Sequence, residues 1–482
     1  MVHHAGTVEL VLDHLEKGDN VTLVHCAQDL QSCPANKWHQ ESLCGSCRAE
    51  TNYSVRKLLP KTKFLVHRQL SDFTVDQSQN VPTISTRDEL LDYLYKDCPV
   101  GRLVVSQLMS NFGDLLFELD SEEKAALCRR LVVSAVNLYE ATASLINELD
   151  VSATYTWNGR RPSDGPVWWA TKAAQREAFT YVTSGKFGRV YVSPESSVQE
   201  PQRAGFGTQI SDELSSLGTS EVRDEALVAL SNYKESRDRP MDSPDYSEMR
   251  SEIMPVIRPT VTILLSSAGE SYHLDSFFQF FSRLPYTWVR DAVRLISEEL
   301  PHYEIVVKWH PQMRNVGPME EAHICKVIEE SSIATHITPD ENIDAYDLVE
   351  KSEFTVSMGS SVAIWGAANG VPAIILGPAG RTWGRSVYWI DDPNLEKSLR
   401  GILRTSPLPP LDPSDLYNAV VWSNRLSGFP MRFVSMSKQD GVPQVGRRPV
   451  SSRAVRPLRS SFDPIYRRLR ASVRSLRHRG LF

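Results

Sequence analysis

The chain has 482 residues, of which 41% are hydrophobic and 23% charged. This composition is typical of soluble globular proteins with two or three domains, and it excludes collagen-like, wholly disordered and disulfide-rich miniature proteins. No apolar run approaches the roughly 18 residues of a membrane-spanning helix. The first residues, MVHHAGTVELVLDH, lack the pattern of a secretory signal, so we expect a cytoplasmic protein.

The net charge of −6 is unevenly distributed along the chain. Residues 441–482 carry eleven arginines, one acid and no lysine, a charge of +10, so that the rest of the chain sums to −16. Two electrostatically different parts therefore share one chain.

Residues 1–195 alternate apolar segments of helical and strand length, which predicts an N-terminal Rossmann-like domain with a mostly parallel sheet between helices. In chain order we expect a helix that ends at Gly18, strands at 21–26 and 63–67, a helix at 89–95, a segment at 101–110 that starts as a strand, a long helix at 121–149, and strands at 152–159 and 187–193.

Residues 196–258 are rich in Ser, Glu, Gln, Pro and Asp, which predicts a polar linker with one helix near 221–236. The alternation resumes over 259–435. We expect strands at 261–267, 303–311, 334–339, 354–361 and 372–377, and helices at 288–300, 318–331, 343–352 and 362–370. The predicted fold class is therefore α/β, with two doubly wound Rossmann-like domains facing a cleft and a basic tail over 441–482.

Two polar turns follow predicted strands of the second domain. One ends in Lys308-Trp309-His310-Pro311, and the other, Ser357-Met358-Gly359-Ser360-Ser361, opens a helix. Ligands of open parallel sheets bind outside the carboxyl ends of the strands, and a helix N-terminus attracts anions. Either turn alone is equally typical of an ordinary strand end or helix cap. Together they predict a phosphate site formed by Lys308, His310, Pro311, Gly359, Ser360 and Ser361.

A third polar turn, Ser266-Ser267-Ala268-Gly269-Glu270, follows another strand of the same domain. A carboxylate at this edge could take the proton of an acceptor hydroxyl, which makes Glu270 a candidate general base beside His310. The alternative is a glutamate in a helix first turn or a solvated loop.

These motifs, in the order SSAGE (266–270), PHYEIVVKWHP (301–311) and DAYDLVEKSEFTVSMGSSVAIWGAANGVPAIILG (344–377), resemble bacterial capsule and surface polysaccharide biosynthesis proteins, which are glycosyltransferases of the two-lobed GT-B type. Residues 21–48 and YTWNGRRPSDGPVWWATK (155–172) resemble the same family, so the similarity covers most of residues 1–400. The resemblance implies that His310 and the serines bind the nucleotide phosphate. It also implies that Asn158, Gly159 and Arg160 lie on the acceptor side.

One position departs from the family pattern. Many GT-B enzymes hold the ribose hydroxyls with a glutamate in the helix after the serine turn, and this chain has Trp365 about there. The departure leaves open an altered donor or a catalytically silent protein.

From these motifs we predict a metal-independent glycosyltransferase. Its partners would be a nucleotide-sugar donor, CMP-linked in preference to UDP- or GDP-linked, and a polysaccharide or lipid-linked acceptor. No Asp-x-Asp metal motif lies in a suitable place. The alternatives are a teichoic-acid-type phosphotransferase with a CDP-polyol donor, and a silent subunit of a polysaccharide assembly complex.

Four cysteines, Cys26, Cys33, Cys44 and Cys47, fall close together in the sequence. The spacing of Cys44 and Cys47 suits half of a tetrahedral zinc site, which Cys26 and Cys33 would complete as a structural centre. A second CxxC pair is missing, so reduced, packed thiols are the stronger interpretation, in agreement with an odd total of seven cysteines.

The tail segment IYRRLRASVRSLRHRGLF (465–482) repeats apolar residues at helical spacing among arginines. A basic amphipathic helix suits an anionic membrane surface, so we expect peripheral association with the inner membrane face. A cationic tail without a partner is the alternative. Little aromatic interleaving and an acidic body argue against nucleic acid.

Overall fold

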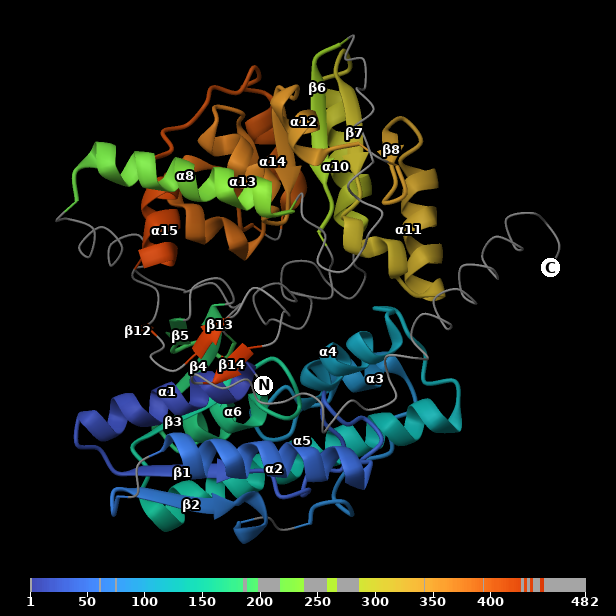
Figure 1. The fold of residues 1–482 in the computed structure, drawn as a ribbon. Coiled ribbons are helices and arrows are strands. Elements are labelled where there is room, and N and C mark those ends of the chain that lie inside the picture. The colour runs from blue at the N-terminus through green and yellow to red at the C-terminus, as the bar shows by residue number, and fades with distance from the viewer. Residues whose placement is uncertain are drawn as a thin grey trace.

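Two α/β lobes make up the part of the chain that the structure describes (Figure 1). The computed structural model describes residues 2–59, 62–73, 76–184, 189–197, 217–237, 258–266, 286–341, 343–392, 394–425, 429–430, 434–436 and 443–445. Among these residues, no helix is both long and apolar enough to cross a bilayer.

The N-terminal lobe comprises the described residues up to 197. Its helices are α1 (Val2–Glu16), α2 (Glu41–Leu58), α3 (Arg87–Asp92), α4 (Val100–Phe112), α5 (Glu122–Leu149) and α6 (Gly165–Ala173). Its strands are β1 (Val21–His25), β2 (Leu65–Gln69), β3 (Ala153–Trp157), β4 (Glu177–Ser184) and β5 (Arg189–Ser193).

The strands of this lobe form two small sheets instead of one continuous parallel sheet. β1 and β2 pair in parallel, and the second sheet has the order β12-β5-β4-β3, in which β12 is Phe429–Pro430. β3 and β4 are parallel, whereas β4 and β5 are antiparallel. The reason is the connection between β4 and β5, which is too short for the crossover that a parallel pair needs.

The C-terminal lobe carries the doubly wound sheet. Its strands are β6 (Thr260–Leu264), β7 (Glu304–Lys308), β8 (Thr335–Ile337), β9 (Phe354–Ser357), β10 (Ala373–Leu376) and β11 (Tyr388–Ile390). All neighbours pair in parallel, in the order β11-β10-β9-β6-β7-β8. The chain builds one half outward from β6 and then crosses over to start the other half at β9, which is the Rossmann strand order. The predicted α/β class is confirmed.

Helices cover this sheet and close its core. They are α8 (Thr219–Arg237), α10 (Thr287–Glu299), α11 (Pro318–Glu330), α12 (Ala345–Glu350), α13 (Ser361–Ala368), α14 (Leu395–Leu403) and α15 (Ser414–Arg425). The helix predicted inside the polar linker is α8, and it packs on this lobe beside α13 and α15 (Figure 1).

After α15 the chain returns to the N-terminal lobe. β12 (Phe429–Pro430) pairs antiparallel with β5, and β13 (Val434–Met436) pairs with β14 (Pro443–Val445). Apart from β14, the arginine-rich tail lies outside the described residues, so the predicted amphipathic helix is not tested.

Two expected elements of the N-terminal lobe are wrong. The segment 101–110, expected to start as a strand, belongs to α4, because its neighbouring valines Val104 and Val105 are buried in a helix that is covered almost all round. The expected helix at 89–95 ends at Asp92, after which Tyr95 and Cys98 form an isolated antiparallel bridge.

Truncation of Phe354 tests the core of the C-terminal lobe. Phe354 starts β9, is fully buried and has one of the largest side chains in the core. Phe354→Ala should lower the free energy of unfolding by about 3–5 kcal/mol, because it removes apolar contacts and leaves a cavity. Urea unfolding followed by circular dichroism measures the change. Val228→Ala on the exposed face of α8 should change it by less than about 0.5 kcal/mol, and equal losses would contradict this packing.

Candidate functional site

The two polar turns leave the sheet at the same level. Leu264 of β6 pairs with Lys308 of β7 on one side and with Ser357 of β9 on the other. Neighbouring strands lie about 4.8 Å apart, so the strand ends that lead to the two turns are about 10 Å apart with only β6 between them. The two turns predicted to act together therefore begin at one edge of one sheet.

This edge includes the point where the strand order reverses. The reversal lies between β6 and β9, and the turn at 358–360 follows β9 directly. In open α/β sheets, ligands bind outside the carboxyl ends of the strands at such a point. The serine turn thus occupies the position where this fold class binds its ligands.

Ser357, the last residue of β9, fixes the shape of the serine turn through its side chain. Its buried hydroxyl oxygen accepts hydrogen bonds from the N–H groups of Gly359 and Ser360, each at 3.2 Å. Ser360 is the N-cap of α13, and its hydroxyl oxygen accepts from the N–H of Val362 at 3.3 Å. The N–H groups of Gly359 and Ser360 are therefore bonded to Ser357 and are not available to bind an anion. The hydroxyl hydrogen of Ser360 stays available as a donor, because accepting a bond uses only a lone pair.

Gly359 fits this turn for two reasons. Its φ of +109° lies in a region that favours glycine, and a Cβ there would lie 2.8 Å from Cβ of Ala379. The segment after β10 therefore packs directly against the serine turn and holds it in shape.

The other turn carries His310 half-buried. Trp309 is buried, and its N–H extends the pairing with β8, which anchors the turn. The carbonyl of His310 accepts from the N–H of Met313 at 2.9 Å at the start of a 3₁₀ turn, and Pro311 is exposed.

Lys308 is directed to the loop that follows β8. Its Nζ lies 3.4 Å from the carbonyl oxygen of Thr338, and burial lowers the pKa of its ammonium, against the attraction of Glu341 and Asp344. Arg314 binds the same loop through an ion pair. Lys308 therefore anchors this loop, and its contact with a donor phosphate stays a prediction.

Glu270, the predicted base, lies outside the described residues. The described part of the turn after β6 ends at Ser266, which is half-buried beyond Leu264. β6 lies between β7 and β9, so Leu265 and Ser266 leave the sheet between the strands that lead to the two polar turns.

The predicted acceptor-side turn follows β3 in the N-terminal lobe. Asn158 and Gly159 have φ values of +56° and +83°, and a Cβ at Gly159 would lie 1.9 Å from the carbonyl oxygen of Ser196. The turn is thus packed under another backbone segment, with Asn158 and Arg160 half-buried. This turn belongs to the N-terminal lobe, whereas the two polar turns belong to the C-terminal lobe.

A buried acid, Asp164, holds the acceptor-side turn. Its Oδ1 accepts from the N–H of Arg161 at 3.0 Å, and its Oδ2 accepts from the hydroxyl of Ser163 at 3.2 Å. Burial raises its pKa to about 7, although these bonds and the charges of Arg161 and Arg160 act in the opposite direction. Asp164 is not among the site residues predicted from the sequence. The available signal was an acid just before Gly165-Pro166 at a helix start.

Trp365 has a structural place. It is 8% exposed, and its ring makes an edge contact with Tyr346 of α12 at a centroid distance of 5.1 Å. Position 365 of α13 therefore faces the core. A side chain at this position does not reach a ribose bound outside the sheet edge.

The four N-terminal cysteines do not form a metal site in the described residues. Cys44 and Cys47 lie on α2, and Cys33 lies in an isolated bridge with Asn36, whose amide donates to the sulfur of Cys44 at 3.2 Å. No group of three His, Cys, Asp or Glu side chains in the described ranges is arranged to hold a metal. Burial raises the pKa of the Cys33 thiol, which favours the protonated form over the thiolate that binds zinc.

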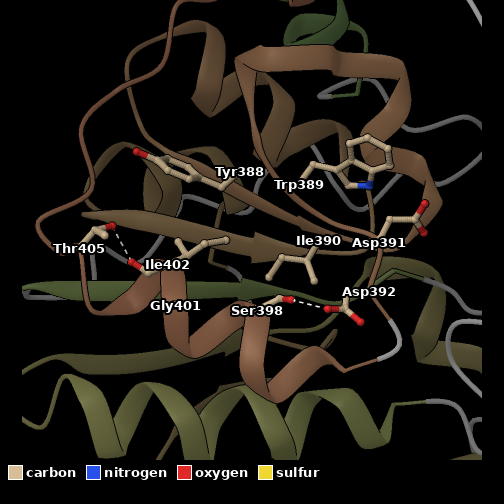
Figure 2. A pocket seen from close by; sticks show the side chains of 9 residues that line it. All are labelled: Tyr388, Trp389, Ile390, Asp391, Asp392, Ser398, Gly401, Ile402 and Thr405. Carbon is tan, nitrogen blue, oxygen red and sulfur yellow. Dashed lines mark hydrogen bonds between the residues drawn. The ribbon is translucent and has the colours of Figure 1, made fainter.

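A pocket of about 630 Å³ lies at the side of the sheet, between the outermost strand β11 and α14, and β10 separates β11 from β9 (Figure 2). Its polar side chains are already bonded within the protein: the hydroxyl of Ser398 donates to Asp392 at 2.9 Å, and that of Thr405 donates to the carbonyl of Ile402 at 2.7 Å. The carboxylates of Asp391 and Asp392 make it a poor site for phosphate.

Comparisons with known proteins give structural matches only. No family model matches the chain, and no curated protein matches it in sequence. Two solved structures with a similar fold are the β-Kdo 2,4-transferase and the β-Kdo 2,7-transferase of KpsC from Thermosulfurimonas dismutans. The first has 16% identity and a TM-score of 0.34 and covers 56% of this chain and 79% of its own. The second has 13% identity and a TM-score of 0.35 and covers 63% and 85%.

A third similar structure is the UDP-GlcNAc 2-epimerase of Methanocaldococcus jannaschii in complex with UDP-GlcNAc and UDP. It has 10% identity and a TM-score of 0.28, and it covers 61% of this chain and 80% of its own. Matches at this level assign neither a family nor an activity to the chain.

Substitution of Ser357 tests the construction of the serine turn. Ser357→Ala leaves the N–H groups of Gly359 and Ser360 without their acceptor, so we expect a loss of about 1–2 kcal/mol in the free energy of unfolding and faster hydrogen exchange at both amides. Mass spectrometry of hydrogen exchange measures this. Ser398→Ala on α14 should leave both amides unchanged, and unaltered exchange in Ser357→Ala would contradict the assigned bonds.

The raised pKa of Asp164 predicts a pH dependence of stability. Its carboxyl has a pKa of about 7 when folded, against a usual value of 3.8, so the neutral form is favoured in the fold. Its stabilising contribution is complete below about pH 4 and is lost as the pH rises through 7. Relative to Asp164→Asn, the wild type should therefore lose up to about 4 kcal/mol between pH 4 and pH 8.5. Urea unfolding of both proteins across this range measures the difference, and parallel curves would refute it.

Proposed function

We propose that this protein is a glycosyltransferase of GT-B type that moves a sugar from a nucleotide-sugar donor to a glycan or lipid-linked acceptor in surface polysaccharide synthesis. One observation carries the proposal. The His-Pro turn and the serine turn begin from residues paired with the same Leu264, at the edge where the strand order reverses. The motif resemblance described above supports the same function.

In this proposal the C-terminal lobe binds the donor. The hydroxyl of Ser360 donates to a phosphate oxygen, Ser361 stands at the N-terminus of α13, and the helix dipole adds a favourable potential. His310 donates to an oxygen of the same phosphate group from the other side of β6.

The chemical step needs a base and a stabilised leaving group. The acceptor hydroxyl oxygen attacks the anomeric carbon, the bond from that carbon to the phosphate oxygen breaks, and the acceptor proton passes to Glu270. The departing nucleotide gains negative charge on its terminal phosphate. Donors fixed before the reaction at His310 and Ser360 stabilise that charge without reorganisation.

The proposal assigns the acceptor to the N-terminal lobe. The turn at Asn158, Gly159 and Arg160 is held rigid by Asp164 and by its packing under Ser196, which suits a binding turn. We propose a CMP-linked donor before UDP- or GDP-linked ones, and no metal at the reacting centre. The arginine-rich tail would bring the enzyme to an anionic membrane surface on the cytoplasmic side.

A nucleotide-binding screen tests the donor site. Thermal shift with CMP, CDP, UDP and GDP should show stabilisation by at least one of them, about 2.7 kcal/mol at a hundredfold excess over Kd. His310→Ala should weaken that nucleotide roughly tenfold or more, through loss of a charge-assisted hydrogen bond. His302→Ala, an exposed histidine before β7, is the matched control and should bind as the wild type does. Equal affinity in all three proteins would overturn the site.

Transfer assays with the matching sugar-linked donors complete the test. Release of free nucleotide that depends on acceptor and is lost in His310→Ala supports sugar transfer. Release of CMP from a CDP-polyol identifies the phosphotransferase instead. Nucleotide binding without turnover of any donor identifies a catalytically silent subunit.

A further inference from the structure

The first turn of α11 lacks a side chain of its own to cap it. Helix starts leave N–H groups that need acceptors, and the residue at the N-cap position is Gly317. The acceptor is Asp114, from the loop between α4 and α5 in the other lobe. Its Oδ2 accepts from the N–H of Met319 at 2.9 Å, and its Oδ1 accepts from the N–H of Glu320 at 3.1 Å.

Gly317 provides the space for this cap. Its φ of −73° and ψ of 168° are open to any residue, so conformation does not require glycine. A Cβ at this position, however, would lie 2.3 Å from Cβ of Asp114 and 2.4 Å from its Oδ2. The side chain of Asp114 therefore fills the volume where the N-cap residue's own side chain would begin.

The contact is reciprocal. Oε2 of Glu320 accepts from the N–H of Leu115 at 2.8 Å, and the N–H of Gly317 donates to the carbonyl of Gly113. A cap side chain bonded to the third helical N–H, with the third residue's carboxylate bonded back beside the cap, is the pattern of a capping box. Here its halves lie on two lobes, 206 residues apart along the chain.

Because Asp114 and Glu320 are both buried, each carboxylate and the N–H groups that it accepts from depend on the contact between the lobes. Asp114 and Glu320 are 5% and 6% exposed, and the hydroxyl of Tyr286 also donates to Glu320 at 2.8 Å. Burial raises the pKa of Glu320, and the neighbouring charge of Asp114 adds to the shift, whereas the bonds from Leu115 and Tyr286 lower it. Leu115 is buried in an apolar cluster that extends through both lobes. Water cannot readily replace any of these acceptors while the lobes stay together.

We propose that Asp114 and Glu320 form an interlobe latch, which couples the capping of α11 to the relative position of the two lobes. When the lobes separate at this contact, α11 loses its cap and the N–H of Leu115 loses its acceptor in one event. The latch does not depend on the proposed sugar transfer, because it is made of structural contacts outside the sheet edge.

Hydrogen exchange measured by mass spectrometry at single-amide resolution tests the latch on the full chain. The amides of Leu115 and Met319, on different lobes, should exchange at similar rates in the wild type, since one opening exposes both. Asp114→Ala should accelerate both by roughly tenfold or more. Small-angle scattering should show a larger radius of gyration.

A second variant separates helix capping from lobe coupling. In Asp114→Gly combined with Gly317→Ser, position 114 has no Cβ to meet the new side chain, and a serine hydroxyl caps α11 from within its own chain segment. The latch predicts that Met319 regains protection while Leu115 still exchanges fast and the radius of gyration stays enlarged. Recovery of all three measurements, or an unchanged Leu115 amide in Asp114→Ala, would overturn the proposal.

Glu320→Met serves if Asp114→Ala fails to fold. Methionine keeps the approximate length of the side chain and leaves the Asp114 cap in place, but its thioether is only a weak acceptor and does not replace the carboxylate at the Leu115 N–H. The latch predicts faster exchange at Met319 as well as at Leu115, whereas a local effect would change Leu115 alone and refute it. Glu321→Met, in the same helix turn but exposed, is the matched control and should alter neither amide.

Discussion

The parallel pairing around Leu264 is the constraint on which the proposed chemistry depends. Leu264, at the carboxyl end of the inner strand β6, pairs with both neighbouring strands, so a slip of either pair would move its turn relative to the other. All residues of β6 and β9 are buried, on both faces of the sheet, which resists such a slip. Packing in the core thereby sets the geometry of polar groups that stand outside it.

The two lobes combine a continuous apolar cluster with a small number of buried polar contacts. Apolar burial is non-directional and holds surfaces together without selecting one orientation. The paired carboxylates at 114 and 320 do select one, because each must meet particular N–H groups. In this protein the apolar cluster holds the two lobes together, and the buried polar contacts fix their relative orientation.

Much of the C-terminal lobe could be predicted because its strands are short apolar runs that end in polar turns. FTVSMGSSVAIW shows β9, its turn and the start of α13 directly. α4 was misassigned because Val104 and Val105 suit a strand as well as a helix that is buried on all sides. The serine turn was found, but the internal use of its N–H groups depends on the burial of Ser357. Asp164 and the Asp114–Gly317 pair depend on tertiary contacts that no local pattern records.

The return of the chain to pair β12 with β5 ties the lobes in a second way, through topology. If the chain were cut between the two lobes, β5 would lose β12 and become an edge strand with unpaired backbone donors and acceptors. The N-terminal half, expressed alone, would then tend to self-associate through this edge strand. Coexpression could restore the missing neighbour, so complementation of two fragments is a more promising strategy than study of either alone.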